Sequence, residues 1–415
     1  MNIAMFTDYF PPEVGSASNL FYELGAELTL KGHRVTVFTG FPKYNVDIDT
    51  LPSRYRKRLW LKEVMKEMQI IRMRTLQMPR HILTLRGLDQ ITTSIAFLFS
   101  ALFLASHDID IVLIYSPPLF LGFTGIALRC FTKAKVVLNV QDLFPQSAID
   151  LGVLKNKILI ALLRTAESRL YRSVNAVTVH SPGNKEYVIH CGAHESRTSI
   201  VHNPVDVRSL TPGGRMNSFR ERYQIAEETF IVSFAGVIGY SQDLDVVIDT
   251  AKILEDKSRI IFYIVGDGVE KERLLRKAGE MRNIRFLPMI SRPEYAELLR
   301  ASDIGLVTLR RNVMTPVVPS KILSIMASGR PIVASLPQHG DAPVIIREAE
   351  CGLCTDPENP RKLAEAIEYL FENPDAAARY GSNGRDYAVK QFSLEACVEA
   401  YEKLFREVIS NNKDT

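Results

Sequence analysis

Short apolar runs alternate with stretches of helical spacing along the whole chain. Residues 2–7 and 34–39 are strand-like runs, and Leu20, Leu24 and Leu28 between them recur on one face of a helix. Strand, helix and strand in this order predict a βαβ unit, and therefore a parallel sheet. Further strand-like runs follow at residues 109–115, 135–140, 176–180 and 200–202.

A second alternating series begins after a polar stretch at residues 206–228, which contains Pro212, Gly213 and Gly214. We interpret this stretch as a linker between two domains, because Pro and Gly interrupt regular structure. The strand-like runs beyond it are residues 230–235, 259–265, 283–287, 304–308 and 331–335.

Two such series predict an α/β fold of two Rossmann-like domains, residues 1–205 and 229–390, with a cleft between them. The last helix, within residues 391–415, is expected to pack back toward the first domain. The 415 residues are too many for one ordinary core, and 46% hydrophobic with 24% charged residues is typical of a soluble globular protein. In open sheets of this kind, ligands bind beyond the carboxyl ends of the strands.

One uncharged apolar run, residues 91–105, raises the question of a membrane. It is shorter than the ~20 residues that span a bilayer. We interpret it as a buried core helix; a helix lying partly in a membrane surface is the alternative. The chain starts directly on a strand-like run without a basic leader, so we expect a cytoplasmic protein. Five cysteines, an odd number, argue against a disulfide framework.

Two loops carry candidate anion-binding residues. Gly15 and Ser16 precede the first helix, whose N-terminal amides would attract a phosphate; a plain turn is the alternative. Gly266, Asp267 and Gly268 follow a strand, but the third glycine of the dinucleotide motif is missing, so the signal for NAD is weak. No Walker A pattern occurs in the chain.

The most specific segment is Ser320-Lys321 at the start of a predicted helix. Ser320 suits the N-cap position, and Lys321 then falls in the first turn, where a cation is unfavourable unless an anion binds there. Arg310 and Arg311 lie upstream and would add to an anion site. A solvated basic loop is the alternative interpretation.

Two further segments carry candidate chemistry. Asp142 ends a strand-like run, where a carboxylate would bind a sugar hydroxyl or act as a base, or else cap a helix. A basic run with the only tryptophan suggests an anionic membrane surface, with a nucleic-acid arm or a solvated face as alternatives. The candidate residues of that run are Arg54, Arg56, Lys57, Arg58 and Trp60.

Taken in order, these segments resemble glycosyltransferase family 4 of the GT-B fold, in particular bacterial enzymes of O-antigen, capsule and colanic-acid assembly such as fucosamine transferases. The resemblance covers nearly the whole chain. It rests on Pro11-Pro12-Glu13, Gly32-His33-Arg34, Gln141-Asp142-Leu143-Phe144-Pro145, Asn203-Pro204, Ala235 to Gly239, Gly266-Asp267-Gly268, Pro319-Ser320-Lys321 and Ser328-Gly329-Arg330-Pro331.

The resemblance implies a retaining, metal-independent transfer from a nucleoside-diphosphate sugar, usually UDP-linked, without any cofactor. Lys321 and the Gly15–Ser16 loop match the positions that neutralise the leaving diphosphate. The segments at Gly236, Gly239 and Gly266 to Gly268 would line the nucleotide. Asp142 matches the acidic position on the acceptor side, and Glu13 belongs to the same side.

The chain also departs from the family pattern. The family often has two glutamates eight positions apart, where this chain has Pro316 and Ser324. Ser324 or the backbone would then have to bind the ribose. The usual Arg and Lys pair after Gly239 is also missing, so phosphate neutralisation falls on Lys321 and Arg310.

From these patterns we expect a glycosyltransferase that adds a hexosyl or N-acetylhexosaminyl group to a lipid-linked saccharide at the inner face of the cell membrane. Its partners would be a nucleotide sugar, a polyprenyl-diphosphate-linked or other lipid-linked glycan and the anionic membrane, and not nucleic acid. A nucleotide-sugar epimerase of the same fold, or a non-catalytic nucleotide-sugar-binding partner of another transferase, is the alternative.

Overall fold

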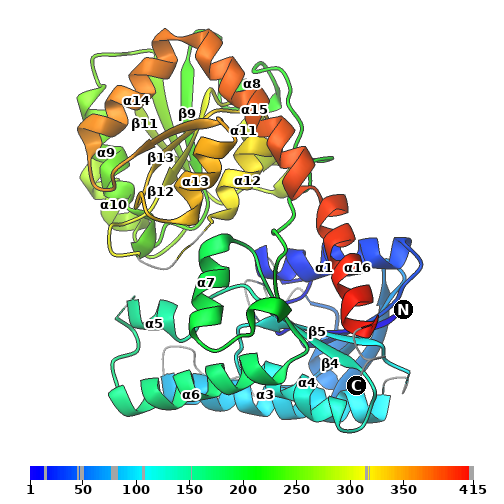
Figure 1. The fold of residues 1–415 in the computed structure, drawn as a ribbon. Helices are drawn as coiled ribbons and strands as arrows, with labels where there is room; N and C mark the ends of the chain where they lie inside the picture. The colour runs from blue at the N-terminus through cyan, green and yellow to red at the C-terminus, as the bar shows by residue number, and fades with distance from the viewer. Residues whose placement is uncertain are drawn as a thin grey trace. The chain divides into compact units, whose positions relative to one another are not determined.

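The computed structural model describes residues 1–13, 16–43, 46, 51–75, 83–104, 108–150, 152–313, 316 and 318–410. The chain divides into two units: unit 1 comprises Met1–Asn203 and Leu394–Thr415, and unit 2 comprises Pro204–Ser393. Each unit holds one largely or wholly parallel sheet covered by helices on both faces (Figure 1). The predicted fold of two Rossmann-like α/β domains is therefore confirmed.

The sheet of unit 1 has eight strands in the order β3-β4-β2-β1-β5-β6-β7-β8. All neighbours are parallel except β3 and β4, which form an antiparallel pair. The strands are β1 (Asn2–Phe6), β2 (Arg34–Gly40), β3 (Trp60–Met65), β4 (Met68–Met73), β5 (Ile111–Ser116), β6 (Lys135–Val140), β7 (Ala176–Val179) and β8 (Thr198–Ile200). The helices are α1 (Ser16–Leu30), α2 (Arg54–Lys57), α3 (Leu83–Leu104), α4 (Leu121–Arg129), α5 (Gln146–Asp150), α6 (Lys157–Ser173), α7 (Pro182–His190), the 3₁₀ turn η2 (Glu195–Arg197) and α16 (Leu394–Ser410).

Alternation along the strands divides the core of unit 1 into two layers. Ala4 and Phe6 of β1 face the layer formed with α3, α4, α6 and α7, whereas Ile3 and Met5 face the layer formed with α1 and α16. Tyr401 of α16 is buried in that second layer. The last helix is therefore part of the core of unit 1, although it follows unit 2 in the sequence.

The sheet of unit 2 has six parallel strands in the order β11-β10-β9-β12-β13-β14. The strands are β9 (Phe230–Ala235), β10 (Ile260–Val265), β11 (Ile284–Leu287), β12 (Ile304–Thr308), β13 (Ile332–Ser335) and β14 (Gly352–Thr355). The helices are α8 (Ser218–Arg222), the 3₁₀ turn η3 (Tyr240–Gln242), α9 (Leu244–Ile253), α10 (Lys271–Ala278), α11 (Arg292–Ala301), α12 (Ser320–Ala327), α13 (Asp341–Glu348), α14 (Pro360–Glu372) and α15 (Pro374–Phe392).

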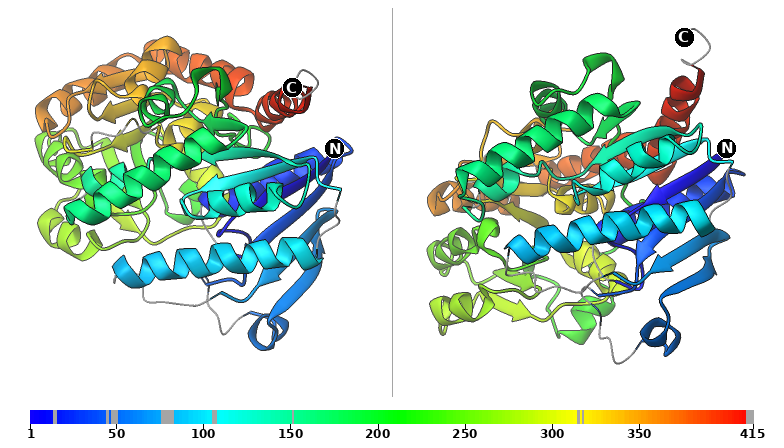
Figure 2. Two further views of the ribbon diagram at one scale, coloured as in Figure 1. Left: turned by 60° about the horizontal axis from the view of Figure 1, so that its bottom comes forward. Right: turned by 90° about the horizontal axis from the view of Figure 1, so that it is seen from below.

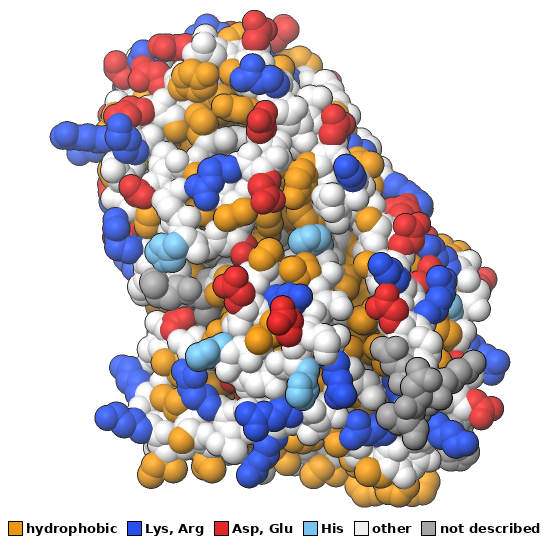
Figure 3. Space-filling view, in the orientation of Figure 1, with side chains coloured by type: hydrophobic (Ala, Val, Ile, Leu, Met, Phe, Trp, Pro, Cys, Tyr) orange, Lys and Arg blue, Asp and Glu red, His pale blue; other side chains and the backbone are white. Residues whose placement is uncertain are grey.

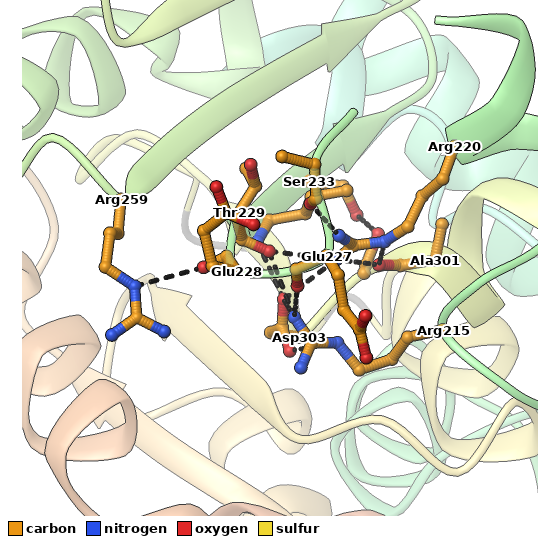
Figure 4. Close-up of polar contacts among 12 residues, drawn as sticks. Arg215, Arg220, Glu227, Glu228, Thr229, Ser233, Arg259, Ala301 and Asp303 are labelled. Atoms are coloured by element: carbon orange, nitrogen blue, oxygen red, sulfur yellow. Dashed lines mark hydrogen bonds and ion pairs between the residues drawn. The ribbon is translucent and has the colours of Figure 1, made fainter. Parts of the chain in front are cut away.

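The stretch at residues 206–228, interpreted from the sequence as a linker, packs as part of unit 2. Arg215 Nε lies 2.9 Å from Asp303 Oδ1, and Arg220 Nη2 lies 3.4 Å from Asp303 Oδ2 (Figure 4). The Arg220 side chain is fully buried and also donates to the carbonyl oxygens of Ala301 and Thr229. These charged contacts, together with the buried side chains of Val207, Leu210, Phe219 and Ile225, fasten the stretch to unit 2.

The antiparallel pair β3–β4 is the main element that the sequence pattern did not indicate. The basic run at residues 54–62 forms α2 and the first part of β3, so it is neither a free arm nor a single helix. The strand β14 at the edge of unit 2 was also not expected.

Candidate functional site

The two glycine loops of unit 2 lie backbone against backbone at the carboxyl ends of β9 and β10. The amide of Ile238 donates a 2.8 Å hydrogen bond to the carbonyl of Asp267. Gly266 has φ +148°, and a Cβ added there would lie 1.9 Å from the Gly236 oxygen. A Cβ added at Gly268 would lie 2.3 Å from the Ile238 oxygen. Only glycine allows this approach, which leaves a surface of bare backbone at the strand ends.

Lys321 lies across this surface from the first turn of α12. A Cβ added at Gly236 would lie 2.7 Å from Lys321 Cε, so the lysine stem occupies the space that the missing side chain leaves. Its Nζ donates a 2.7 Å hydrogen bond to Gln242 Oε1 and lies 4.8 Å from the centre of the Phe234 ring. The structure therefore brings together Lys321 and the glycines that the sequence singled out in separate segments.

The charge of Lys321 has no carboxylate partner within the part of the chain that the structure describes. Burial lowers the pKa of its amine to about 8, because the charged form loses water without gaining a counter-charge. A cation at a helix N-terminus, beside exposed backbone of glycine loops, favours an anion such as a phosphate. The site is therefore suited to bind and neutralise a phosphate group.

Two residues of this site were not found from the sequence. Gln242, in the segment after Gly239 that lacks the family's usual Arg and Lys pair, accepts the Lys321 hydrogen bond. Lys271 at the start of α10 donates a 3.0 Å hydrogen bond to the Gly266 oxygen. Neither follows a motif, because each is brought to the glycine loops by the packing of another element.

The sequence suggested Ser320 as the N-cap of α12, and this prediction is wrong. The helix begins at Ser320, and Pro319 holds the cap position without a side-chain hydrogen bond. Ser320 is exposed in the first turn, and its carbonyl accepts a 3.3 Å hydrogen bond from Ser324 Oγ. The two serines thus lie one turn apart on the helix that carries Lys321.

Arg310 lies beside the site but is already in contact with acidic side chains. Its Nη2 lies 3.6 Å from Asp245 Oδ2 and 3.9 Å from Glu270 Oε2. Arg273 binds the same two carboxylates, at 2.5 and 2.7 Å. These contacts offset the charge of Arg310 and leave Lys321 as the more strongly favoured phosphate ligand.

Of the other predicted donor residues, Asp267 and Gly239 lie in the two glycine loops. Asp267 is exposed, and its Oδ1 accepts a 2.8 Å hydrogen bond from the Gly268 amide. Gly239 precedes the turn η3, and a Cβ added there would meet Val237 only at 3.7 Å. The fold does not therefore require glycine at position 239.

In unit 1, Asp142 lies with two tyrosines at the carboxyl ends of β1, β5 and β6. Asp142 is exposed. Burial, together with the electrostatic effects of Tyr9 and Asp142, raises the pKa of the Tyr115 hydroxyl well above its usual value. The rings of Tyr9 and Tyr115 meet edge to face, with centres 6.3 Å apart. Asp142 is thus an exposed carboxylate near a packed pair of tyrosines, of which Tyr9 is half-buried and Tyr115 is buried.

A buried chain of hydrogen bonds supports the loop that carries Asp142. Tyr401 Oη accepts a 2.7 Å hydrogen bond from Asn139 Nδ2, and Asn139 Oδ1 accepts one of 2.8 Å from Gln141 Nε2. Gln141 also exchanges two hydrogen bonds with Asn203, of 2.9 and 2.7 Å. Gln141, the residue before Asp142, is thus held by Asn203 directly and by α16 through Asn139.

Glu13, expected on the acceptor side, is buried and holds its own loop. Its Oε1 accepts a 2.7 Å hydrogen bond from the Lys43 amide, and its Oε2 accepts one of 3.4 Å from the Phe10 amide. Nearby, Lys43 Nζ lies 3.0 Å from Asp8 Oδ1 and 3.6 Å from Asp89 Oδ2. The sequence did not indicate this buried charged cluster, whose members come from three separate segments.

Several predicted residues fall partly or wholly outside the described structure. Gly15 lies outside the described residues, and so do the side chains of Ser16, Arg56 and Lys57. Arg54 Nη2 lies 3.6 Å from Glu63 Oε2. Arg58 and Trp60 are exposed at the start of β3.

Neither a metal cluster nor a membrane span is found in the described part of the chain. No group of three or more His, Cys, Asp or Glu side chains there is arranged to hold a metal ion. No helix among the same residues has both the length and the apolar character required to cross a bilayer.

Two family models match most of the chain. The model for Glycosyltransferase Family 4 matches residues 17–209, and the model for Glycosyl transferases group 1 matches residues 216–387. The chain is 24% identical over 407 residues to WcaI of Escherichia coli strain K12, named as a glycosyl transferase of colanic acid biosynthesis, covering 95% of this chain and 97% of that protein. It is 20% identical over 411 residues to O-antigen chain mannosyltransferase C of Escherichia coli, covering 98% of each.

Solved structures with the same fold include several glycosyltransferases. Sucrose-phosphate synthase from Thermosynechococcus elongatus superposes with a TM-score of 0.76 at 17% identity, covering 99% of both chains. Anabaena Alr3699/HepE in complex with UDP gives a TM-score of 0.72 at 16% identity, covering 98% of this chain and 100% of that one. WaaG, a glycosyltransferase involved in lipopolysaccharide biosynthesis, gives a TM-score of 0.65 at 16% identity, covering 97% of this chain and 99% of that one.

Proposed function

Because the chain belongs to the family 4 glycosyltransferases of the GT-B fold, we propose that it transfers a sugar from a UDP-linked donor to a lipid-linked saccharide in the synthesis of a cell-surface polysaccharide. The class of reaction follows from the two matched family domains. Relatives named for colanic acid and O-antigen synthesis support the polysaccharide setting. The donor, the acceptor, the stereochemical outcome and the place of action are parts of the proposal.

The position of Lys321 is the observation that supports the proposed donor site. Its amine lies at the start of α12, across Gly236, and no carboxylate among the described residues pairs with it. A diphosphate at this point would receive the lysine charge together with the amides of the helix N-terminus. The same fold holds UDP in Alr3699/HepE, which supports a UDP-linked donor.

We propose that Lys321 acts on the leaving group. When the bond between the sugar and the diphosphate breaks, negative charge grows on the diphosphate, and a fixed cation stabilises that charge in the transition state. Lys321 and the first turn of α12 would thereby supply the stabilisation that a metal ion supplies in other transferases. Transfer with retention at the anomeric carbon, without metal or cofactor, is the expected course.

The acceptor side is proposed to lie at Asp142. Its exposed carboxylate follows β6, beside Tyr9 and Tyr115, and can bind a sugar hydroxyl or accept its proton. We propose a lipid-linked saccharide as acceptor, at the inner face of the cell membrane, because relatives are named for colanic acid and O-antigen synthesis.

The experiment is a measurement of nucleoside-diphosphate release from UDP-, GDP- and dTDP-sugars, with a membrane lipid extract as acceptor. We expect acceptor-dependent release from one donor and a loss of about 100- to 1,000-fold in kcat for Lys321→Ala. Lys362→Ala is the matched control, because Lys362 is exposed and pairs with Glu365 on the same helix.

Three results would contradict the proposal. An unchanged rate in Lys321→Ala would remove the assigned phosphate site. Conversion of the donor sugar without any acceptor would indicate an epimerase. Tight UDP binding without release from any donor would indicate a non-catalytic partner of another transferase.

A further inference from the structure

The outer side of α3 carries a row of exposed hydrophobic side chains. Ile91, Ile95, Phe99 and Phe103 recur every four residues and are between 40% and 77% exposed. The opposite side of the helix, with Phe97, packs into the core of unit 1. The helix is therefore apolar on both sides, whereas a helix at a water-exposed surface is polar on its outer side.

The helix α6 lies on the same face of the sheet, with α4 between it and α3. It contributes Leu170 and Tyr171 to the core layer that α3 also enters, so both helices cover one face (Figure 2). Ile158 and Leu162, one turn apart on its outer side, are 75% and 63% exposed. In Figure 3, hydrophobic side chains line the lower edge of the molecule, where Figure 1 places α3, α4 and α6.

The register of the antiparallel pair places part of β3 on this face too. Trp60 lies opposite Met73, and Lys62 lies opposite Ile71. Directly opposed residues share a face of the sheet, and Ile71 and Met73 belong to the layer formed with α3. Trp60 is 47% exposed. The basic-aromatic run and the apolar run at residues 91–105, distant in the sequence, therefore contribute to one surface, which we call the docking face (the outer sides of β3, α3 and α6).

Charge on the docking face is mainly positive. Each of its three elements has a single acidic residue, and all three turn inward: Glu63 and Asp89 have side chains 12% and 14% exposed, and Glu167 is fully buried. The same three elements carry several exposed cations. They are Lys62, Lys157, Arg164, Arg169 and Arg172.

We propose that the docking face binds the surface of an anionic phospholipid bilayer, with α3 lying in the plane of the interface. Large apolar side chains bordered by cations are the features that such a surface selects. A second copy of the chain fits less well, because a two-fold contact would bring the same cations against each other. The inference rests on the proposed function for the lipid-linked acceptor and deepens it by naming the face that meets the membrane.

The experiment is co-sedimentation of the full chain with vesicles of phosphatidylglycerol and phosphatidylcholine, or of phosphatidylcholine alone, without any sugar. We expect binding to the anionic vesicles that weakens as salt is added. The double variant Phe99→Ser with Phe103→Ser should bind at least about tenfold more weakly. The control double variant Leu30→Ser with Met289→Ser changes residues of similar exposure outside the docking face and should bind as the wild type does.

The result would overturn the inference if the wild type did not bind anionic vesicles, or if the two double variants bound equally. A concentration-dependent dimer that Phe99→Ser with Phe103→Ser abolishes would assign the face to a second copy. UDP titration and thermal unfolding show that the variants are folded. Vesicle binding without turnover would defeat the proposed function alone, and turnover on a soluble acceptor without vesicle binding would defeat the docking face alone.

Discussion

Burial changes the chemistry of the amine at the start of α12, and this gives a prediction at the scale of one residue. The pKa of Lys321 is lowered to about 8, so the amine loses its proton as the pH rises through that value. Because only the protonated form neutralises a diphosphate, kcat/KM for the donor should fall above about pH 8. Measurement of kcat/KM across the alkaline range tests this. Lys321→Arg keeps its charge there, so its profile should lack this fall, and an identical fall in both proteins would contradict the assignment.

A second prediction concerns the glycine loops. Gly266→Ala places a Cβ 1.9 Å from the Gly236 oxygen at φ +148°. The backbone must shift, which should cost about 1–3 kcal/mol of unfolding free energy and weaken UDP binding, since Lys321 rests on Gly236. Thermal unfolding and UDP titration measure both effects.

The control for Gly266→Ala is a glycine in the same pair of loops. Gly239→Ala meets only Val237 at an ordinary contact distance of 3.7 Å, so its stability should stay near that of the wild type. Equal loss of stability in both variants would show that close backbone contact is not what requires Gly266.

A site residue could be predicted from the sequence where one short segment determines both its place in the fold and its chemical role. Lys321 and Gly266 follow this rule, because a strand end or helix start fixes their place. Gln242 and Lys271 do not, because their roles depend on contacts with other elements. The sequence showed that Glu13 lies in a loop. It could not show that the Lys43 amide, distant in the sequence, donates a hydrogen bond to the Glu13 carboxylate.

At the scale of elements, most parallel strands were predictable, whereas the edge strand β14 and the β3–β4 pair were not. Buried parallel strands are continuous apolar runs, which the sequence displays directly. The turn between β3 and β4 has Lys66 and Glu67 at φ 49° and 63°. Asn or Gly normally signals such a turn, and neither residue is present. The order of strands in each sheet also has no local signal, because packing decides it.

The helix α16 gives a prediction about coupling between elements. Tyr401→Phe leaves the buried Asn139 amide without the acceptor it uses at 2.7 Å. We expect a loss of about 1–3 kcal/mol in unfolding free energy. The looser support of Gln141 should lower kcat while leaving KM for the donor unchanged.

Steady-state kinetics and chemical unfolding check this prediction, with Tyr369→Phe as the control because that tyrosine is 44% exposed on unit 2. A rise in KM for the donor with normal kcat would argue against a link between Tyr401 and the Asp142 loop.

At the scale of the whole molecule, the last helix is part of the first unit. A chain ending at Ser393 would lack Val398, Tyr401 and Phe405, each at most 3% exposed. Loss of roughly 1.5–3 kcal/mol for each side chain approaches the whole stability of a typical domain. We expect this truncated chain to lose cooperative unfolding of unit 1 in calorimetry, whereas a chain ending at Ser410 should keep it. Normal unfolding of the shorter chain would contradict the assignment of α16 to the core.

Unit 2 begins and ends at neighbouring points, since Val205 pairs with Ser393 in a parallel bridge and its amide donates to the Phe392 oxygen at 2.7 Å. In engineering terms, residues 204–393 form an insert with two adjacent splice points. A related insert that accepts a different nucleotide sugar can be exchanged at those two points without cutting the core of its host. If unit 2 holds the donor, as proposed, hybrid enzymes built in this way would change the sugar that is delivered while keeping the recipient.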